Sequence, residues 1–227
     1  MQIRQLFDAT SSTYSYLLWD TDTQQAALID SVKEQVARDS KLIDELGLNL
    51  QYLLETHIHA DHITGSGKLR QLYNAKIVVH RNSDCDCADI LADHGDDLSL
   101  GEEHIKILYT PGHTNTDISY LVSGAIFTGD TLLIRGSGRT DFQSGDAGMA
   151  YDSIVNHIFT LPNSTVVYPG HDYNGFTESS IREEKILNPR LGNNKTRTEY
   201  IAIMNAMNLP KPKLIDEAVP SNIKCGN

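Results

Sequence analysis

The chain has 227 residues, of which 40% are hydrophobic and 22% are charged, as is ordinary for a globular protein. It carries 30 acidic against 19 basic residues, a formal net charge of −11. No cluster of Lys and Arg is present. Because phosphate neutralisation requires clustered cations, these features argue against a nucleic-acid-binding protein.

The predicted elements of the first half alternate between strands and helices. Four Asp and Thr residues separate the first two apolar runs, which is typical of a hairpin. The strand–helix–strand order that follows indicates α/β layering. Apolar spacing predicts strands at 14–19, 25–30, 51–55 and 76–80 and helices at 32–46 and around Leu69 and Leu72.

The second half returns to strands before it ends in helices. We expect one domain over residues 1–227, with a C-terminal helical extension from about residue 177 that finishes in a Pro-rich tail. The patterns predict strands at 104–110, 118–122, 125–128 and 165–168 and helices at 149–159, 181–187 and 198–207.

Three cysteines, Cys85, Cys87 and Cys225, are too few to indicate a disulfide framework. We therefore expect Cys85 and Cys87 to be free thiols, Cys225 to be structural, and the compartment to be reducing. The first residues contain no apolar stretch long enough for a signal peptide or a membrane span. The expectation is a cytoplasmic protein without a membrane partner.

Polar side chains follow four of the predicted strands at the point where each ends. These side chains belong to His57, His113, Asp130 and His171. Strand-end loops that meet at one edge are where α/β proteins generally assemble their active sites. A glycine precedes His113, Asp130 and His171, which lets the backbone turn tightly there.

The motif His57-x-His59-x-Asp61-His62 places four metal-ligand side chains within six residues. Imidazole and carboxylate groups suit Zn, Mn or Fe(II). In an extended segment, residues two apart point to one side, so His57, His59 and Asp61 can face one cavity. His62 joins them if the chain turns there. Packing alone gives no reason to crowd these groups, whereas the isolated histidines elsewhere are expected to be ordinary polar residues.

The order of these motifs, from Tyr14 to His171, resembles the metallo-β-lactamase superfamily, whose fold is an αββα four-layer sandwich. Residues 128–143 resemble persulfide dioxygenases more narrowly, as do residues 57–67 and 171–176. Shorter matches at 187–190, 208–212 and 219–222 extend that resemblance over nearly the whole chain.

The resemblance implies a single Fe(II) per chain, bound by His57, His113 and Asp130. The other motif residues, His59, Asp61, His62 and His171, would then surround the metal or form a vacant second site. Arg139 and Tyr173 match the positions that contact substrate in the family, and Arg135 is a weaker candidate. The family often has Cys at the position of Ser137.

The implied reaction is the oxidation of glutathione persulfide with O2 and water to sulfite and glutathione. The nearest alternative is a thioester hydrolase of the glyoxalase II type with two metals, because the residues alone do not exclude a second metal. A non-catalytic binding module that has kept the fold is a further alternative. No acid or base residue is assigned, and the oligomeric state is left open, with a homodimer as one alternative.

Overall fold

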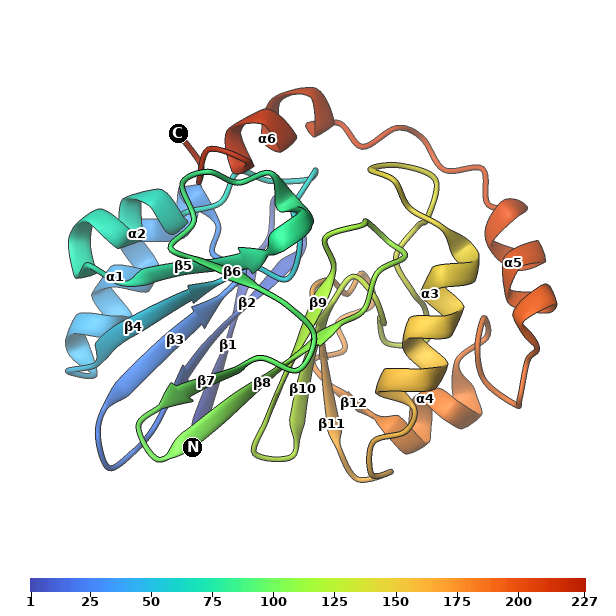
Figure 1. Cartoon of the computed structure of the whole chain (residues 1–227), viewed down its shortest axis with the longest axis horizontal. Coiled ribbons are helices and arrows are strands. Elements are labelled where there is room, and N and C mark those ends of the chain that lie inside the picture. The colour runs from blue at the N-terminus through green and yellow to red at the C-terminus, as the bar shows by residue number, and fades with distance from the viewer.

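Two six-stranded sheets form the centre of the computed structural model, which describes residues 1–227 (Figure 1). In the first sheet the order is β1 (Gln2–Asp8), β2 (Thr13–Trp19), β3 (Gln25–Ile29), β4 (Asn49–Leu54), β5 (Lys76–His80) and β6 (Ile90–Ala92). In the second sheet the order is β12 (Ser179–Ser180), β11 (Val166–Pro169), β10 (Ala125–Gly129), β9 (Ile118–Val122), β8 (Glu103–Tyr109) and β7 (Asp97–Leu100).

Helices cover the outer face of each sheet, which gives the four layers expected from the motifs (Figure 1). On the first sheet lie α1 (Val36–Glu45), which follows a 3₁₀ turn at Lys33–Gln35, and α2 (Ser66–Tyr73). On the second lie α3 (Ala147–Ser153), which continues as a π-helical segment at Ile154–Ile158, α4 (Ile181–Leu187) and α5 (Arg197–Asn205). The last helix is α6 (Ile215–Asn222), and a short 3₁₀ turn at Arg81–Ser83 follows β5.

Strand β2 shows how the sequence produces this layering. All seven of its residues are buried, because both faces of the strand are covered. Tyr16 and Leu18 pack into the core between the two sheets, whereas Leu17 and Trp19 pack into the core beneath α1 and α2. Successive side chains of a strand point to opposite faces, so one apolar run supplies two cores.

Most predicted elements are present, and the predicted hairpin is confirmed by the antiparallel pairing of β2 with β3. Strands β1, β6, β7 and β12 were not predicted. The Pro-rich tail contains α6, which includes Pro220. Figure 1 shows the connection between α5 and α6 passing over one edge of the sandwich, from the helices of the second sheet to those of the first.

The prediction that Cys87 is a free thiol is wrong, because Cys87 and Cys225 form a disulfide across a separation of 138 residues. Cys85 is a buried free thiol, as expected. The chain brings Cys225 back to the β5–β6 connection through α6, a contact that cysteine spacing does not reveal. The argument for a reducing compartment therefore loses its basis, and a cytoplasmic location stays a prediction. None of the helices has the length and apolar character needed to span a membrane.

Candidate metal centre

The loops that follow β4, β8, β10 and β11 meet at one edge of the sandwich. They carry His57, His113, Asp130 and His171, each within a few residues of the end of its strand. The structure thus brings together the four positions that the sequence placed after strands. A bridge between Thr13 and His171 joins the two sheets at this edge.

The first donor set consists of His57, His113 and Asp130. One ligand atom from each lies within 4.8 Å of the others, and His113 Nε2 lies 3.8 Å from Asp130 Oδ2. The other ring nitrogen of His113, Nδ1, donates a hydrogen bond to the Arg139 carbonyl at 2.7 Å. This bond fixes the ring and leaves the Nε2 lone pair for a metal.

His57 is oriented by a second chain of hydrogen bonds. Its Nδ1 lies 3.0 Å from the Thr56 hydroxyl, which donates in turn to Asp30 Oδ2 at 2.8 Å. Burial, together with the neighbouring His59 and His113, holds the pKa of His57 well below its ordinary value. A neutral imidazole is the form that binds metal, so this set fits a metal ion with two nitrogen ligands and one oxygen ligand.

The second donor set consists of His59, Asp61 and His62, whose ligand atoms also lie within 4.8 Å of one another. His62 Nδ1 lies 2.9 Å from Asp61 Oδ2. His59 Nδ1 and His62 Nε2 are buried without a hydrogen-bond partner. Both nitrogens are therefore available to a ligand, so this set can surround one metal or hold a second one.

His171 lies between the two donor sets. Its Nδ1 is 2.7 Å from Asp130 Oδ1, and its Nε2 is 3.1 Å from Asp61 Oδ2. Burial would lower the pKa of His171, but the Asp130 and Asp61 carboxylates hold that pKa well above its ordinary value. Burial likewise opposes ionisation of Asp130, yet the adjacent His171 holds the pKa of that carboxyl below its usual range. His171 therefore contacts one carboxylate of each donor set through its two ring nitrogens.

Two residues of the first donor set, His113 and Asp130, open onto a cavity of about 680 Å³. Asp61, His113, Asp130 and His171 lie on its wall, and the α5–α6 connection covers it from the other side. This volume is within the range of roughly 300–1,000 Å³ that is typical of small-molecule sites.

Both predicted substrate-contact residues, Arg139 and Tyr173, line this cavity. Arg139 is not free, because Nε and Nη2 donate to the Asp141 carboxylate at 2.6 and 2.8 Å and Nη1 donates to the Pro210 carbonyl at 2.6 Å. Tyr173 is 73% exposed. Arg135 does not line the cavity and pairs instead with the Glu183 and Glu184 carboxylates.

Two cationic residues of the cavity wall, Arg190 and Lys213, were not predicted as site residues. Arg190 donates to the Ser137 carbonyl, and burial lowers its pKa. Lys213 is exposed and makes no ion pair. Lys213 lies in the Pro-rich tail, for which the sequence predicts no helix or strand. Its place at the cavity follows from the path of this tail over the cavity, which the sequence does not indicate.

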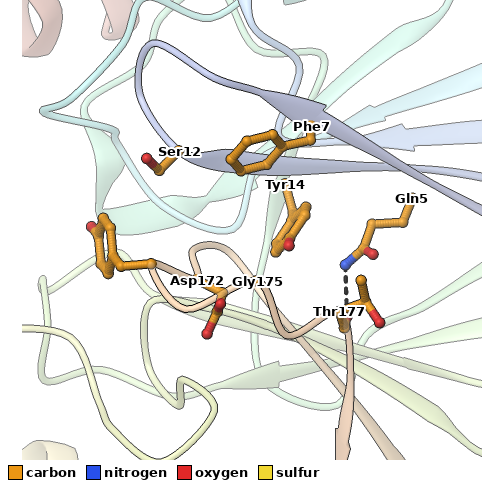
Figure 2. A pocket seen from close by; sticks show the side chains of 8 residues that line it. Gln5, Phe7, Ser12, Tyr14, Asp172, Gly175 and Thr177 are labelled. Carbon is orange, nitrogen blue, oxygen red and sulfur yellow. Dashed lines mark hydrogen bonds between the residues drawn. The ribbon is translucent and has the colours of Figure 1, made fainter.

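A second pocket of about 500 Å³ lies beside the metal centre, against the loop that follows His171 (Figure 2). Phe7 and Tyr14 form one wall, with ring centroids 5.1 Å apart. Gln5 Nε2 donates to the Thr177 carbonyl at 2.7 Å, as Figure 2 shows. No histidine or cysteine lines this pocket. Its contacts anchor the loop that carries Tyr173, which lines both cavities.

The two helix-covered sheets, with a His and Asp centre at one loop edge, define a protein of the metallo-beta-lactamase superfamily, and residues 9–171 match that family. Within it, the chain belongs to the persulfide dioxygenase family. It is 47% identical over 227 residues to the mitochondrial persulfide dioxygenase ETHE1 of Homo sapiens, and the match covers 99% of this chain and 88% of the human protein.

A solved structure and a more distant relative give two further comparisons. The crystal structure of ETHE1 from Myxococcus xanthus superposes with a TM-score of 0.98 at 53% identity and covers 100% of both chains. The cytoplasmic hydroxyacylglutathione hydrolase of Arabidopsis thaliana is 33% identical over 219 residues, which cover 92% of this chain and 82% of that protein. The fold class and the family expected from the motifs are confirmed.

The glycine before His113 gives a test of how the ligand loop is positioned. Gly112 has φ +146°, and a Cβ there would lie 2.3 Å from the Ala150 backbone. We expect Gly112→Ala to destabilise the fold by about 3 kcal/mol and to reduce bound metal, because α3 and the His113 loop must separate. Thermal unfolding and elemental analysis measure the two effects.

Gly124→Ala is the matched control, because Gly124 has φ +78° and no atom within 4 Å of the added Cβ. It should cost only the backbone strain of about 1 kcal/mol and leave metal content unchanged. Equal losses in the two variants would contradict the role assigned to the close packing of Gly112.

Proposed function

We propose that this chain is a persulfide dioxygenase that oxidises glutathione persulfide with O2 and water to sulfite and glutathione at one Fe(II). The observation that carries the proposal is the convergence of His57, His113 and Asp130, of which His113 and Asp130 line the cavity. Two histidines and one carboxylate are the donor set typical of non-haem Fe(II) oxygenases. The 47% identity to the human persulfide dioxygenase supports the same chemistry.

Bound by these three residues, Fe(II) would supply redox chemistry with dioxygen and open coordination positions for O2 and the persulfide sulfur. The chain itself holds the ligands in place. The Arg139 carbonyl fixes the His113 ring, and the Thr56 hydroxyl, backed by Asp30, fixes the His57 ring. Such partners of the ligands set both their orientation and their basicity.

His171 links the two donor sets, because its two ring nitrogens lie 2.7 Å from Asp130 Oδ1 and 3.1 Å from Asp61 Oδ2. Groups held in this way beside a metal ligand orient what binds there. The second donor set is therefore proposed to orient water and substrate near the metal.

The cationic wall of the cavity matches a substrate with carboxylates. Glutathione carries two carboxylates, and Lys213 and Arg190 offer positive charge on the wall. The charge of Arg139 is already balanced by Asp141, so we propose that Arg139 shapes the wall more than it supplies net charge. Tyr173 offers a hydroxyl at the mouth of the cavity.

Lys213→Ala is expected to raise the KM for glutathione persulfide about fivefold and to change kcat little. The reason is that a solvated ion pair at the cavity mouth contributes about 1 kcal/mol to binding alone. Steady-state oxygen uptake measures both constants. Lys211→Ala is the control, because Lys211 pairs with Asp216 and does not line the cavity. If Lys211→Ala raised KM as much, the subsite assignment would be wrong.

A hydrolase with two metals is the second candidate function. The intact set of His59, Asp61 and His62, with two unpartnered buried nitrogens, is the observation that favours it. The relationship to a hydroxyacylglutathione hydrolase points the same way. The experiment that separates the candidates is elemental analysis followed by oxygen uptake with glutathione persulfide and hydrolysis of lactoylglutathione.

One iron per chain with oxygen consumption supports the dioxygenase. Two metals per chain with hydrolysis of the thioester, and no oxygen uptake, would overturn it. A cytoplasmic location, a homodimer and a single domain stay predictions, which fractionation, light scattering and limited proteolysis can test.

A further inference from the structure

Three sulfur atoms lie together on the side of the first sheet that α6 covers. Cys87 and Cys225 form the disulfide, and the Cys85 thiol lies 3.3 Å from Cys87 Sγ and 3.8 Å from Cys225 Sγ. Cys85 and Cys225 are buried, and Cys87 is half-buried. The Cys85 thiol therefore lies beside the Cys87–Cys225 bond and not in line with it, so it is within reach of Cys87 Sγ once that sulfur carries a different leaving group.

The disulfide joins the segment after α6 to the connection between β5 and β6. Three residues before Cys225, the buried Asn222 binds the loop that carries the metal motif. Its Nδ2 donates to the His59 and His62 carbonyls at 2.9 and 2.8 Å, and its Oδ1 accepts from the Thr64 amide at 2.8 Å. The disulfide is therefore close in the chain to the side chain that holds this loop.

Two further contacts fasten the same C-terminal segment. Lys33 Nζ donates to the Gly226 carbonyl at 2.7 Å, and the Gly67 amide donates to the Cys225 carbonyl at 3.0 Å. Figure 1 shows α6 and the C-terminus above α2, at the end of the connection that passes over the sandwich edge. Release of Cys225 would leave this segment without a covalent tie, held by hydrogen bonds and by the packing of buried residues such as Ala218.

We propose that Cys85, Cys87 and Cys225 form an exchange site for small-molecule thiols, and that the Cys87–Cys225 disulfide locks the segment that holds the metal loop. A small thiol attacks Cys87, the most exposed of the three sulfurs, and forms a mixed disulfide with it. Cys225 leaves as a thiolate and takes up a proton. The C-terminal segment is then no longer tied covalently to the β5–β6 connection.

Cys85 completes the exchange. Its thiolate attacks Cys87 in the mixed disulfide, forms a Cys85–Cys87 disulfide and returns the small thiol. One disulfide is present at each stage, so no oxidant or reductant is consumed and the small thiol acts catalytically. Burial raises the pKa of the Cys85 thiol, which keeps the locked form from rearranging quickly by itself.

Peptide mapping by mass spectrometry, with and without one equivalent of glutathione per chain, tests the chemistry. We expect the Cys87–Cys225 disulfide before treatment, and afterwards a Cys85–Cys87 disulfide with Cys225 open to alkylation. In Cys85→Ser the reaction should stop at a mixed disulfide on Cys87. A Cys87–Cys225 bond that is absent from air-purified protein, or that survives the thiol unchanged, would overturn the proposal.

The lock itself is tested by the rate at which a chelator removes Fe(II) from the loaded protein. Thiol treatment should accelerate release about tenfold in the wild type, whereas Cys225→Ser should release metal quickly with or without the thiol. If Cys225→Ser does not fold, the treated and untreated wild type still give the comparison. Equal rates of metal release from treated and untreated wild type would refute the lock. It would also be refuted if a second metal equivalent bound the three cysteines and shielded their thiols from alkylation.

Discussion

We expect His113→Ala to remove bound metal and oxygen uptake together. His113 Nε2 is one of three ligand atoms that converge within 4.8 Å, and its loss leaves only His57 and Asp130. Replacement of groups that merely orient ligands already costs roughly 10–100-fold in metal affinity or activity. We therefore expect more than about 100-fold weaker metal binding and activity at background level. Elemental analysis and oxygen uptake on the folded variant measure both losses.

His62→Ala is the informative companion variant. His62 belongs to the second donor set, and its Nε2 has no hydrogen-bond partner. It becomes a metal ligand only if a second metal binds to that set. With one iron per chain, His62→Ala should keep its metal and lose at most about tenfold in activity. A binuclear centre would instead lose one metal equivalent. If His113→Ala kept both metal and activity, the site and the enzymatic function would both be wrong.

The convergence of the candidate ligand residues was predictable because these residues follow local rules. His113, Asp130 and His171 each follow a glycine at the end of a strand, and strand ends at one edge of a sheet must meet. The close approach of Gly112 to α3 and of Gly129 to Thr56 shows why no side chain could replace these glycines. The order of the motifs and the close packing of their glycines therefore both indicate where the candidate ligands lie.

Features that depend on the return of the C-terminus were not predictable. Helix α6 contains Pro220 and follows Pro210 and Pro212, so the sequence predicts a Pro-rich tail and no helix there. The Cys87–Cys225 disulfide, the cationic Lys213 and the Asn222 contacts all follow from the path of this segment. Each is a contact between positions far apart in the chain, which spacing along a single sequence does not encode.

The ion pair of Arg139 illustrates a different limit of prediction from sequence. The sequence places a cation close to Asp130 and so suggests a carboxylate-binding residue, but Asp141, two positions later, already binds the guanidinium through two bonds. Arg139 also donates to the Pro210 carbonyl and thereby attaches the α5–α6 connection to the cavity wall. A motif match identifies the position of a residue, whereas its available charge depends on neighbours that only the structure reveals.

Asn222→Ala has the largest expected effect on stability. The change leaves the His59 and His62 carbonyls and the Thr64 amide without their partner in a buried environment. Each unsatisfied buried group costs about 1–3 kcal/mol. We therefore expect a loss of at least about 3 kcal/mol, which lowers Tm by roughly 6–12 °C in a chain of this size. Calorimetry in the presence of a chelator measures the effect without a contribution from bound metal.

Two controls separate lost hydrogen bonds from lost volume. Asn222→Asp keeps the shape and the acceptor for Thr64 but turns a carboxylate oxygen toward two carbonyls, so it should destabilise about as strongly as Asn222→Ala. Asn205→Ala, at an exposed position, should change stability by less than about 0.5 kcal/mol. If Asn222→Ala melted within two degrees of the wild type, about the limit set by a change below 1 kcal/mol, α6 would not support the metal loop. The lock assigned to Cys225 would then lack the contact through which it acts.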